Sequence, residues 1–144
     1  MSRVQLALNV ANIDEAIEFY TKLFGVGPAK VRDGYANFAI AEPPLKLVLI
    51  EGDGEPGSLN HLGVEVEDTA KVSDAIIRLS GEGLATEVEE QTTCCYAVQD
   101  KVWVHGPSNE PWEIYTVLAD ADVMLPAGSE CCAPESAVDI QLRK

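Results

Sequence analysis

Two matching segments decide the fold: Val4-Gln-Leu-Ala-Leu-Asn-Val10 and Asn60-His-Leu-Gly-Val-Glu-Val66. Each segment alternates apolar residues with small or polar ones, which is the period of a half-buried β-strand. A shift of 61 − 5 = 56 positions carries Gln5 onto His61. The same shift brings the segments that follow into correspondence, so the sequence indicates one structural unit that occurs twice.

The segment after each strand predicts a helix, at residues 14–25 and 70–81. Both segments end in a glycine, Gly25 and Gly81, which favours the end of a helix. Each predicted helix has an apolar stripe at helical spacing. The stripes are Ile13, Ile17, Tyr20 and Phe24 in the first helix, and Val72, Ala75, Ile76 and Leu79 in the second.

Three short strands are predicted after each helix. In the first half they lie at residues 29–32, 35–41 and 46–51, with a turn at Pro43-Pro44. In the second half they lie at residues 86–90, 95–104 and 112–117, with the middle strand broken near Asp100 and a turn at residues 106–109. The predicted order is therefore β-α-β-β-β, twice.

This order indicates an α+β fold of two tandem modules, at about residues 2–51 and 58–118. Residues 52–57 are rich in glycine, proline and acidic residues, which is typical of a linker. Each module offers a sheet with a helix on one face, so the two open faces can surround a cavity. We predict one domain over residues 1–118 and a loosely ordered tail at residues 119–144.

The composition limits the class of protein. The chain has 144 residues, 47% of them hydrophobic, which is enough for a core. Its net charge of −14 disfavours nucleic acids and anionic membranes as partners. No membrane-spanning apolar stretch and no signal peptide are visible, so we expect a cytoplasmic protein. Modules of this kind can pair within a chain or between chains, which leaves a homodimer open.

Strand alternation places three candidate ligands on the cavity side. Gln5 and His61 occupy matching positions of matching strands, and Glu113 is a single charge in an apolar strand. An amide oxygen, an imidazole nitrogen and a carboxylate suit a divalent metal such as Fe, Mn, Ni or Zn. The alternative is that His61 is a hydrogen-bonded structural residue and that Gln5 and Glu113 face solvent.

Cys94 and Cys95 are adjacent, within Thr92-Thr-Cys-Cys-Tyr96. Adjacent cysteines do not easily form a disulfide with each other, because a disulfide needs α-carbons about 5.5–6 Å apart. Two such thiolates can instead bind one soft metal or metalloid. In a reducing compartment we expect free thiols here and at Cys131-Cys132. The alternative for Cys94-Cys95 is two small apolar residues in a strand.

Residues around the cysteine pair supply further predictions. Tyr96 and Val98 alternate out of the pair and are predicted to line a pocket for the organic part of a ligand. Lys101 is a candidate to favour the thiolate form, although the sequence does not say where its side chain points. Residues 89–93 predict a mobile polar loop that closes over the ligand. For Cys131-Cys132 we weigh delivery of the ligand against adventitious metal binding.

The double β-α-β-β-β pattern, with His61 opening the second half, resembles the vicinal oxygen chelate superfamily of glyoxalases, extradiol dioxygenases and bleomycin- and fosfomycin-resistance proteins. The end of the second half, residues 106–114, resembles the superfamily's D-P-D-G-N-x-x-E-[LI] ending at Pro107, Asn109, Glu113 and the apolar residue that follows. The resemblance covers residues 2–118. It implies the vicinal oxygen chelate fold, with a metal in the cavity.

Longer runs are similar to the ArsI carbon–arsenic lyases, a group that includes cadmium-induced CadI proteins. These runs are the first strand with Gln5 and residues 34–41, 43–49, 59–66 and 92–104. The resemblance implies a non-haem Fe(II) dioxygenase whose metal ligands and catalytic residues are Gln5, His61 and Glu113. It implies that Cys94 and Cys95 bind a trivalent organoarsenical, such as methylarsenite or a trivalent aromatic arsenical, whose carbon–arsenic bond is cleaved with dioxygen to release arsenite.

One departure and two alternatives accompany this resemblance. Extradiol dioxygenases use two histidines and a carboxylate, whereas Gln5 replaces one histidine here, so Ni, Co, Mn or Zn also remain candidates for the site. One alternative is a non-enzymatic, thiol-based protein that binds cadmium or arsenic and has no use for Glu113. The other is a metal-dependent enzyme of the glyoxalase type, which has no use for Cys94-Cys95.

Overall fold

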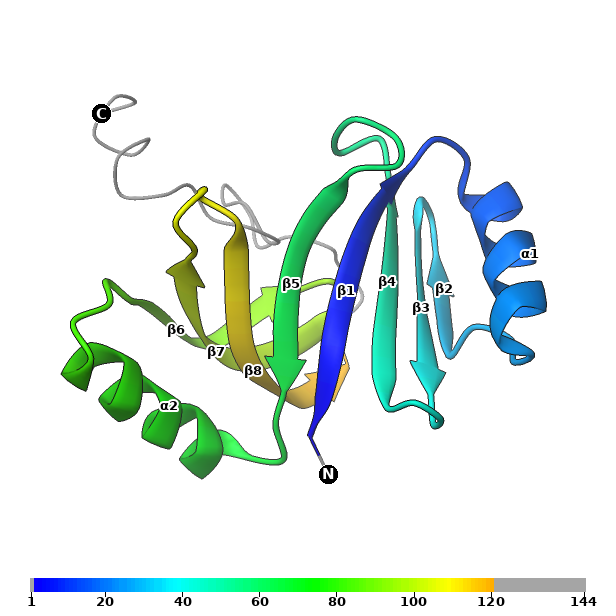
Figure 1. The fold of residues 1–144 in the computed structure, drawn as a ribbon. Coiled ribbons are helices and arrows are strands. Elements are labelled where there is room, and N and C mark those ends of the chain that lie inside the picture. The colour runs from blue at the N-terminus through cyan, green and yellow to red at the C-terminus, as the bar shows by residue number, and fades with distance from the viewer. Residues whose placement is uncertain (1, 121–144) are drawn as a thin grey trace. The chain divides into compact units, whose positions relative to one another are not determined.

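The computed structural model describes residues 2–120. They divide into an N-terminal unit, Ser2–Leu62, and a C-terminal unit that begins at Gly63. The division falls inside strand β5 (Leu59–Glu65). The elements follow the order β1-α1-β2-β3-β4 and then β5-α2-β6-β7-β8, so the predicted α+β fold with a doubled β-α-β-β-β order is confirmed (Figure 1).

The N-terminal unit is built on a sheet in which β1 lies beside β4. The hydrogen-bonded order of its strands is β2-β3-β4-β1, with β1 and β4 parallel and the other pairs antiparallel. The predicted strands are found within one or two residues of their expected ends. Their bounds are Arg3–Val10 (β1), Lys30–Arg32 (β2), Tyr35–Ile40 (β3) and Leu45–Glu51 (β4).

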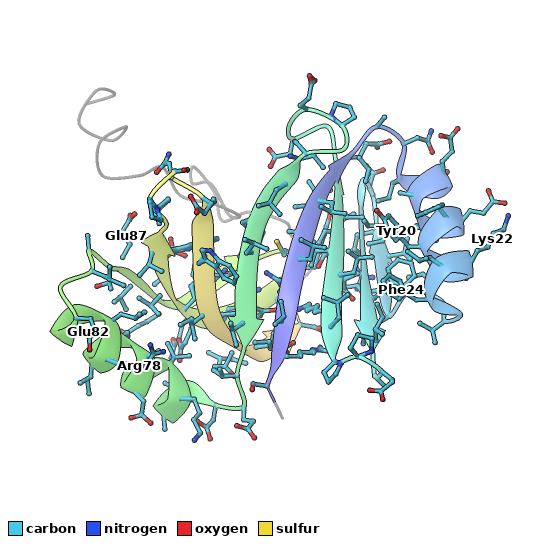
Figure 2. All side chains as sticks on the ribbon, viewed as in Figure 1. Tyr20, Lys22, Phe24, Arg78, Glu82 and Glu87 are labelled. Atoms are coloured by element: carbon cyan, nitrogen blue, oxygen red, sulfur yellow. The ribbon has the colours of Figure 1, made fainter. Side chains whose placement is uncertain are left out.

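Helix α1 (Ile13–Phe24) forms where the sequence predicts it. The Asn12 side chain caps its first turn by accepting a hydrogen bond from the Glu15 N–H, and Gly25 ends it in the left-handed conformation that glycine adopts at little cost. The predicted stripe packs against a core of β3 and β4 residues. Figure 2 shows Tyr20 and Phe24 pointing toward the strands and Lys22 pointing away.

The C-terminal unit contains an antiparallel sheet of β6, β7 and β8, in the order β8-β7-β6. The strands span Glu87–Cys94 (β6), Ala97–His105 (β7) and Pro111–Asp120 (β8). The turn predicted at residues 106–109 is confirmed, since Asn109 N donates to the Gly106 carbonyl at 2.9 Å. Strand β8 includes the first two residues of the expected tail, and Cys131 and Cys132 lie outside the described residues.

Helix α2 (Thr69–Gly81) lies against β7 and β8. Asp68 caps it by accepting a hydrogen bond from the Lys71 N–H at 3.0 Å. The predicted stripe packs with Val102, Val104 and Ile114, so these strand residues face the helix. The helix includes Gly81 and is capped by Glu82, one residue later than predicted. Among residues 2–120, neither helix is long and apolar enough to cross a bilayer.

The predicted faces of the first strand are confirmed. Leu6, Leu8 and Val10 pack with α1, as expected from their alternation. The opposite residues, Gln5 and Asn9, are even more deeply buried, at 3% and 5% exposure. Burying amide groups is costly unless they are hydrogen-bonded, so this face of β1 carries polar residues for a reason other than packing.

Two predictions about the second half are wrong. Strand β7 is unbroken at Asp100, and the segment predicted as a loop, residues 89–93, is part of β6 with a bulge between Glu89 and Thr92. Asp100 does not interrupt the strand because its buried carboxylate accepts hydrogen bonds from Thr69 Oγ1 and from the Gln91 N–H, both at 2.7 Å. It therefore ties the bulge to the start of α2.

Replacing Asp100 by alanine is expected to lower the free energy of unfolding by about 2–4 kcal/mol, because two hydrogen bonds to a buried charged group are lost. Urea unfolding of the variant measures this loss. Asp74→Ala is the control, since Asp74 is exposed on α2. Equal stability of the two variants would mean that the hydrogen bonds of Asp100 to Thr69 and Gln91 do not stabilise the fold.

Candidate functional site

Gln5 and His61, the two residues related by the repeat, are in direct contact. Gln5 Nε2 lies 3.1 Å from His61 Nε2, and the residues are 3% and 1% exposed. Both belong to the N-terminal unit. The pairing of β1 with a matching strand therefore brings together an amide and an imidazole that the sequence predicted to share one face.

A chain of hydrogen bonds sets the tautomer of His61. The Asp53 carboxylate can only accept, so the amide nitrogen of Asn60 faces it at 2.7 Å, and the Asn60 oxygen is left to face His61 Nδ1 at 2.7 Å. His61 Nδ1 therefore carries the hydrogen, and Nε2 presents a lone pair. No pattern in the sequence indicated this role of Asn60 beyond its position next to His61.

Asn9 completes the support of this histidine. Asn60 Nδ2 also donates to Asn9 Oδ1 at 3.0 Å, and Asn9 Nδ2 donates to Ser58 Oγ at 3.0 Å. Gly54 is required beside it, because a β-carbon there would lie 2.7 Å from Asn9 Nδ2. The segment predicted as a simple linker is thus packed against the polar face of β1.

Glu113, the third predicted ligand, forms a buried ion pair in the C-terminal unit. Its Oε1 lies 2.7 Å from Lys101 Nζ, and the two side chains are 4% and 1% exposed. The ammonium group also lies 5.3 Å from the Trp103 ring centroid and 5.8 Å from that of Tyr115. Lys101 thus faces Glu113, and its predicted influence on the cysteine thiolates stays a prediction.

A second carboxylate belongs to Glu89, which lies opposite Lys101 in the pairing of strands β6 and β7. Burial raises the pKa of Glu89 above its usual value of 4.5, while the positive charge of Lys101 acts in the opposite direction. The folded protein therefore holds the Glu89 proton more tightly than the unfolded chain does. This contribution to stability is complete below the unfolded pKa and is lost as the pH rises through the folded one.

Replacing Glu89 by glutamine is therefore expected to stabilise the protein more at pH 7 than at pH 4, because the stability that the bound proton contributes is lost as the pH rises and glutamine does not titrate. Urea unfolding at both pH values measures the difference. Glu90→Gln is the control, because Glu90 is an exposed neighbour in β6. A stability difference that does not change with pH would contradict the role assigned to burial.

The cysteine pair lies at the turn between β6 and β7. Cys94 pairs with Ala97, so Cys95 and Tyr96 form a two-residue hairpin turn, with φ of 52° and 63°. Positive φ at both positions is the pattern of a type I′ turn, which usually contains asparagine and glycine. Here cysteine and tyrosine adopt it, at about 1–2 kcal/mol for each residue. Sequence reasoning missed this turn and placed Cys95 in a strand.

The turn brings the two sulfurs close together. Cys94 Sγ and Cys95 Sγ lie 3.5 Å apart, which is close enough for one soft atom to contact both. Cys94 is 2% exposed, whereas Cys95 is partly accessible. Tyr96 is also buried, and Val98 is partly buried in β7. Their predicted place in a substrate pocket stays a prediction.

One expectation for the cysteines is wrong in this structure. Cys94 is disulfide-bonded, so it is not the free thiol predicted from the sequence. Cys94 and Cys95 do not bridge each other, as the spacing of adjacent residues predicts. Binding of a soft atom by both sulfurs requires that the disulfide first be reduced.

The predicted ligand types fit a divalent metal. The Nε2 lone pair of His61, the amide of Gln5 and the carboxylate of Glu113 are all buried, and their mixed N/O character suits first-row divalent ions. Within residues 2–120 no group of three or more His, Cys, Asp and Glu side chains is gathered as a metal site. The proposed ligand set is not counted among such groups, because Gln5 is of none of these types and only His61 and Glu113 are.

A family comparison agrees with the doubled fold. The model of the glyoxalase/bleomycin resistance protein/dioxygenase superfamily matches residues 3–114. The chain belongs to this superfamily. Within the superfamily, it is similar to a protein of Thermomonospora curvata named trivalent organoarsenical cleaving enzyme, with 66% identity over 136 residues, which covers 93% of this chain and 90% of the relative.

A second relative in the superfamily is the cadmium-induced protein CadI of Mycobacterium bovis. It is 62% identical over 122 residues, which covers 85% of this chain and 80% of the relative. The family resemblance predicted from residue runs such as 59–66 and 92–104 is therefore confirmed.

Solved structures of the superfamily share the fold. An extradiol ring-cleaving dioxygenase from B. fuscum has a TM-score of 0.61 at 19% identity, covering 83% of this chain and 34% of that one. A Mn(II)-bound glyoxalase from Novosphingobium aromaticivorans has a TM-score of 0.60 at 16% identity, covering 88% and 44%. These similarities confirm the predicted vicinal oxygen chelate fold.

Proposed function

We propose that this protein is a lyase that cleaves the carbon–arsenic bond of trivalent organoarsenicals and releases inorganic arsenite. The observation that carries the proposal is the pair of sulfurs, Cys94 Sγ and Cys95 Sγ, held 3.5 Å apart in a turn. The similarity to an organoarsenical cleaving enzyme, at 66% identity, supports the same reaction.

The cysteine pair binds and orients the substrate. Trivalent arsenic with one carbon substituent has two valences left, and two neighbouring thiolates can occupy both. The strained turn at Cys95 and Tyr96 keeps the sulfurs close before the substrate arrives. Both sulfurs together fix the direction of the carbon–arsenic bond, which supplies the positioning that makes an intramolecular reaction fast.

Gln5, His61 and Glu113 are the proposed ligands of one divalent metal ion, with Fe(II) as the expected ion. Their burial and the hydrogen that Asn60 fixes on His61 Nδ1 support this set. The metal supplies the activation of dioxygen, a chemistry that protein side chains do not provide. Lys101 holds the Glu113 carboxylate in place through a contact of 2.7 Å.

Arsenic speciation tests the proposal. Protein whose disulfide has been reduced is incubated with Fe(II) without oxygen and then given air and methylarsenite, and free arsenite is followed over time. Arsenite over many turnovers, only with metal and oxygen present, is the expected result. Parallel samples with Mn(II), Co(II), Ni(II) and Zn(II) identify the active metal.

Two other outcomes would favour the competing functions. Tight stoichiometric binding without arsenite release would indicate a thiol-based sequestering protein. Isomerisation of a glyoxalase-type substrate that survives Cys94→Ser would indicate a different superfamily reaction, because that chemistry does not use the cysteine pair.

The support of His61 predicts a change in metal affinity. Replacing Asn60 by leucine is expected to weaken Fe(II) or Co(II) binding about 10- to 100-fold, because residues that orient a ligating histidine have effects of this size. Anaerobic equilibrium dialysis measures the affinity. Asn12→Leu is the control, since Asn12 caps α1 and has no contact with His61. Equal metal affinity of the two variants would contradict the role of Asn60.

A further inference from the structure

Gln99 is a buried polar residue beside the cysteine turn. It lies in β7, paired with Thr92 and Val117, and is 3% exposed. Its Nε2 donates a hydrogen bond to the Cys94 carbonyl at 2.9 Å. A carbonyl can only accept, so this contact fixes which end of the Gln99 amide is the nitrogen.

The other end of the amide has no partner within residues 2–120. Gln99 Oε1 is buried, and no donor of the described chain reaches it. Buried acceptors without a donor are rare in folded proteins, and each one calls for an explanation. An apolar residue of similar size would fill the same volume without this cost. The oxygen is therefore suited to a donor that arrives with a ligand of the cysteine pair.

We propose that Gln99 Oε1 accepts a hydrogen bond from a hydroxyl group on arsenic while the arsenical is held by one sulfur. This inference rests on the proposed function, since it assigns a further substrate contact to the same site. Cys95 is the more accessible cysteine and reacts first, and Gln99, anchored on the Cys94 backbone, lies beside the cysteine that reacts second.

The chemistry of capture supplies this donor. A trivalent organoarsenical with one carbon substituent carries two hydroxyl groups. When the first thiol attacks, an arsenic–sulfur bond forms, one arsenic–oxygen bond breaks, and the thiol proton leaves with the hydroxyl as water. No atom changes oxidation state. One hydroxyl remains on arsenic until the second thiol displaces it in the same way, and this hydroxyl is the donor for Gln99.

A comparison of two ligands in a single-cysteine background tests the proposal. The variant Cys94→Ser/Cys131→Ser/Cys132→Ser keeps Cys95 as the one thiol of the chain, so capture stops at the one-sulfur stage. Methylarsenite bound to Cys95 then keeps one hydroxyl, whereas dimethylarsenite, which has a single hydroxyl, keeps none. In this background Gln99→Leu is expected to weaken methylarsenite binding about 2- to 13-fold, as for the loss of one hydrogen bond, and to leave dimethylarsenite binding unchanged. Calorimetry on reduced, metal-free, anaerobic protein measures both affinities.

The outcomes separate this role from a structural one. An equal loss of affinity for both ligands would mean that Gln99 only shapes the turn, and no loss for either would also overturn the proposal. Gln99→Met, an unbranched side chain of similar length, provides the same comparison if the leucine variant folds poorly. Failure of the proposed function is seen separately, as wild-type protein that binds methylarsenite but releases no arsenite with Fe(II) and oxygen.

Discussion

Replacing Lys101 by methionine is expected to lower the free energy of unfolding of the metal-free protein by about 3–5 kcal/mol. Lys101 Nζ lies 2.7 Å from Glu113 Oε1, and both side chains are almost fully buried. Methionine fills a similar volume but leaves the Glu113 carboxylate in the interior without its positive partner. Urea unfolding of the wild-type and variant proteins measures the loss.

Two further variants test whether the loss comes from a buried carboxylate that is left without its positive partner. The double variant Lys101→Met/Glu113→Leu is expected to recover stability to within about 1 kcal/mol of wild type, because an apolar pair needs no countercharge. Lys22→Met removes an ion pair with Glu18 whose side chains are 75% and 69% exposed, and it should change stability by less than about 1 kcal/mol. A similar effect of both lysine substitutions would contradict the argument.

The same variant reports on the metal without an activity assay. If Glu113 is a ligand, a divalent ion supplies the positive charge that Lys101→Met removes. Addition of Co(II) should therefore raise the melting temperature of the variant more than that of wild type. An equal shift in both proteins would separate Glu113 from metal binding and leave it with a structural role.

Much of the fold was predictable because it depends on periodicity. Alternation sorted the faces of β1 correctly, and helical spacing identified the stripes that α1 and α2 bury. The errors in the second half arose from polar residues with partners distant in sequence. Asp100 suggested a break in β7, but its carboxylate is satisfied by Thr69 and Gln91, and the bulge it supports made a strand resemble a loop.

The candidate site was predictable in its residue types but not in its contacts. The shift that relates Gln5 to His61 identified the pair, because the repeat places both on matching strands. The positive φ of Cys95 and Tyr96 could not be predicted, since neither residue favours the left-handed region. The direction of Lys101 depends on a diagonal contact across β7 and β8, which local patterns do not encode.

Removing the cysteine pair and removing the proposed metal ligand are expected to separate binding from turnover. Cys94→Ser/Cys95→Ser should lower kcat/KM for methylarsenite at least roughly 1,000-fold, because the positioning of the substrate is lost. Its metal affinity should stay unchanged, since neither sulfur belongs to the proposed ligand set. The Lys101→Met/Glu113→Leu variant should bind methylarsenite with wild-type stoichiometry and release no arsenite.

Arsenite release and ligand binding are measured on the same reduced samples. His105→Gln is the control, because His105 lies at the far end of β7 from the cysteine turn and should leave both quantities unchanged. Arsenite release by the Glu113 variant at the wild-type rate would contradict a metal-dependent lyase. Methylarsenite binding retained by the double serine variant after Cys131 and Cys132 are also replaced by serine would move the arsenic site away from Cys94 and Cys95 and would remove the basis for the role of Gln99 as well.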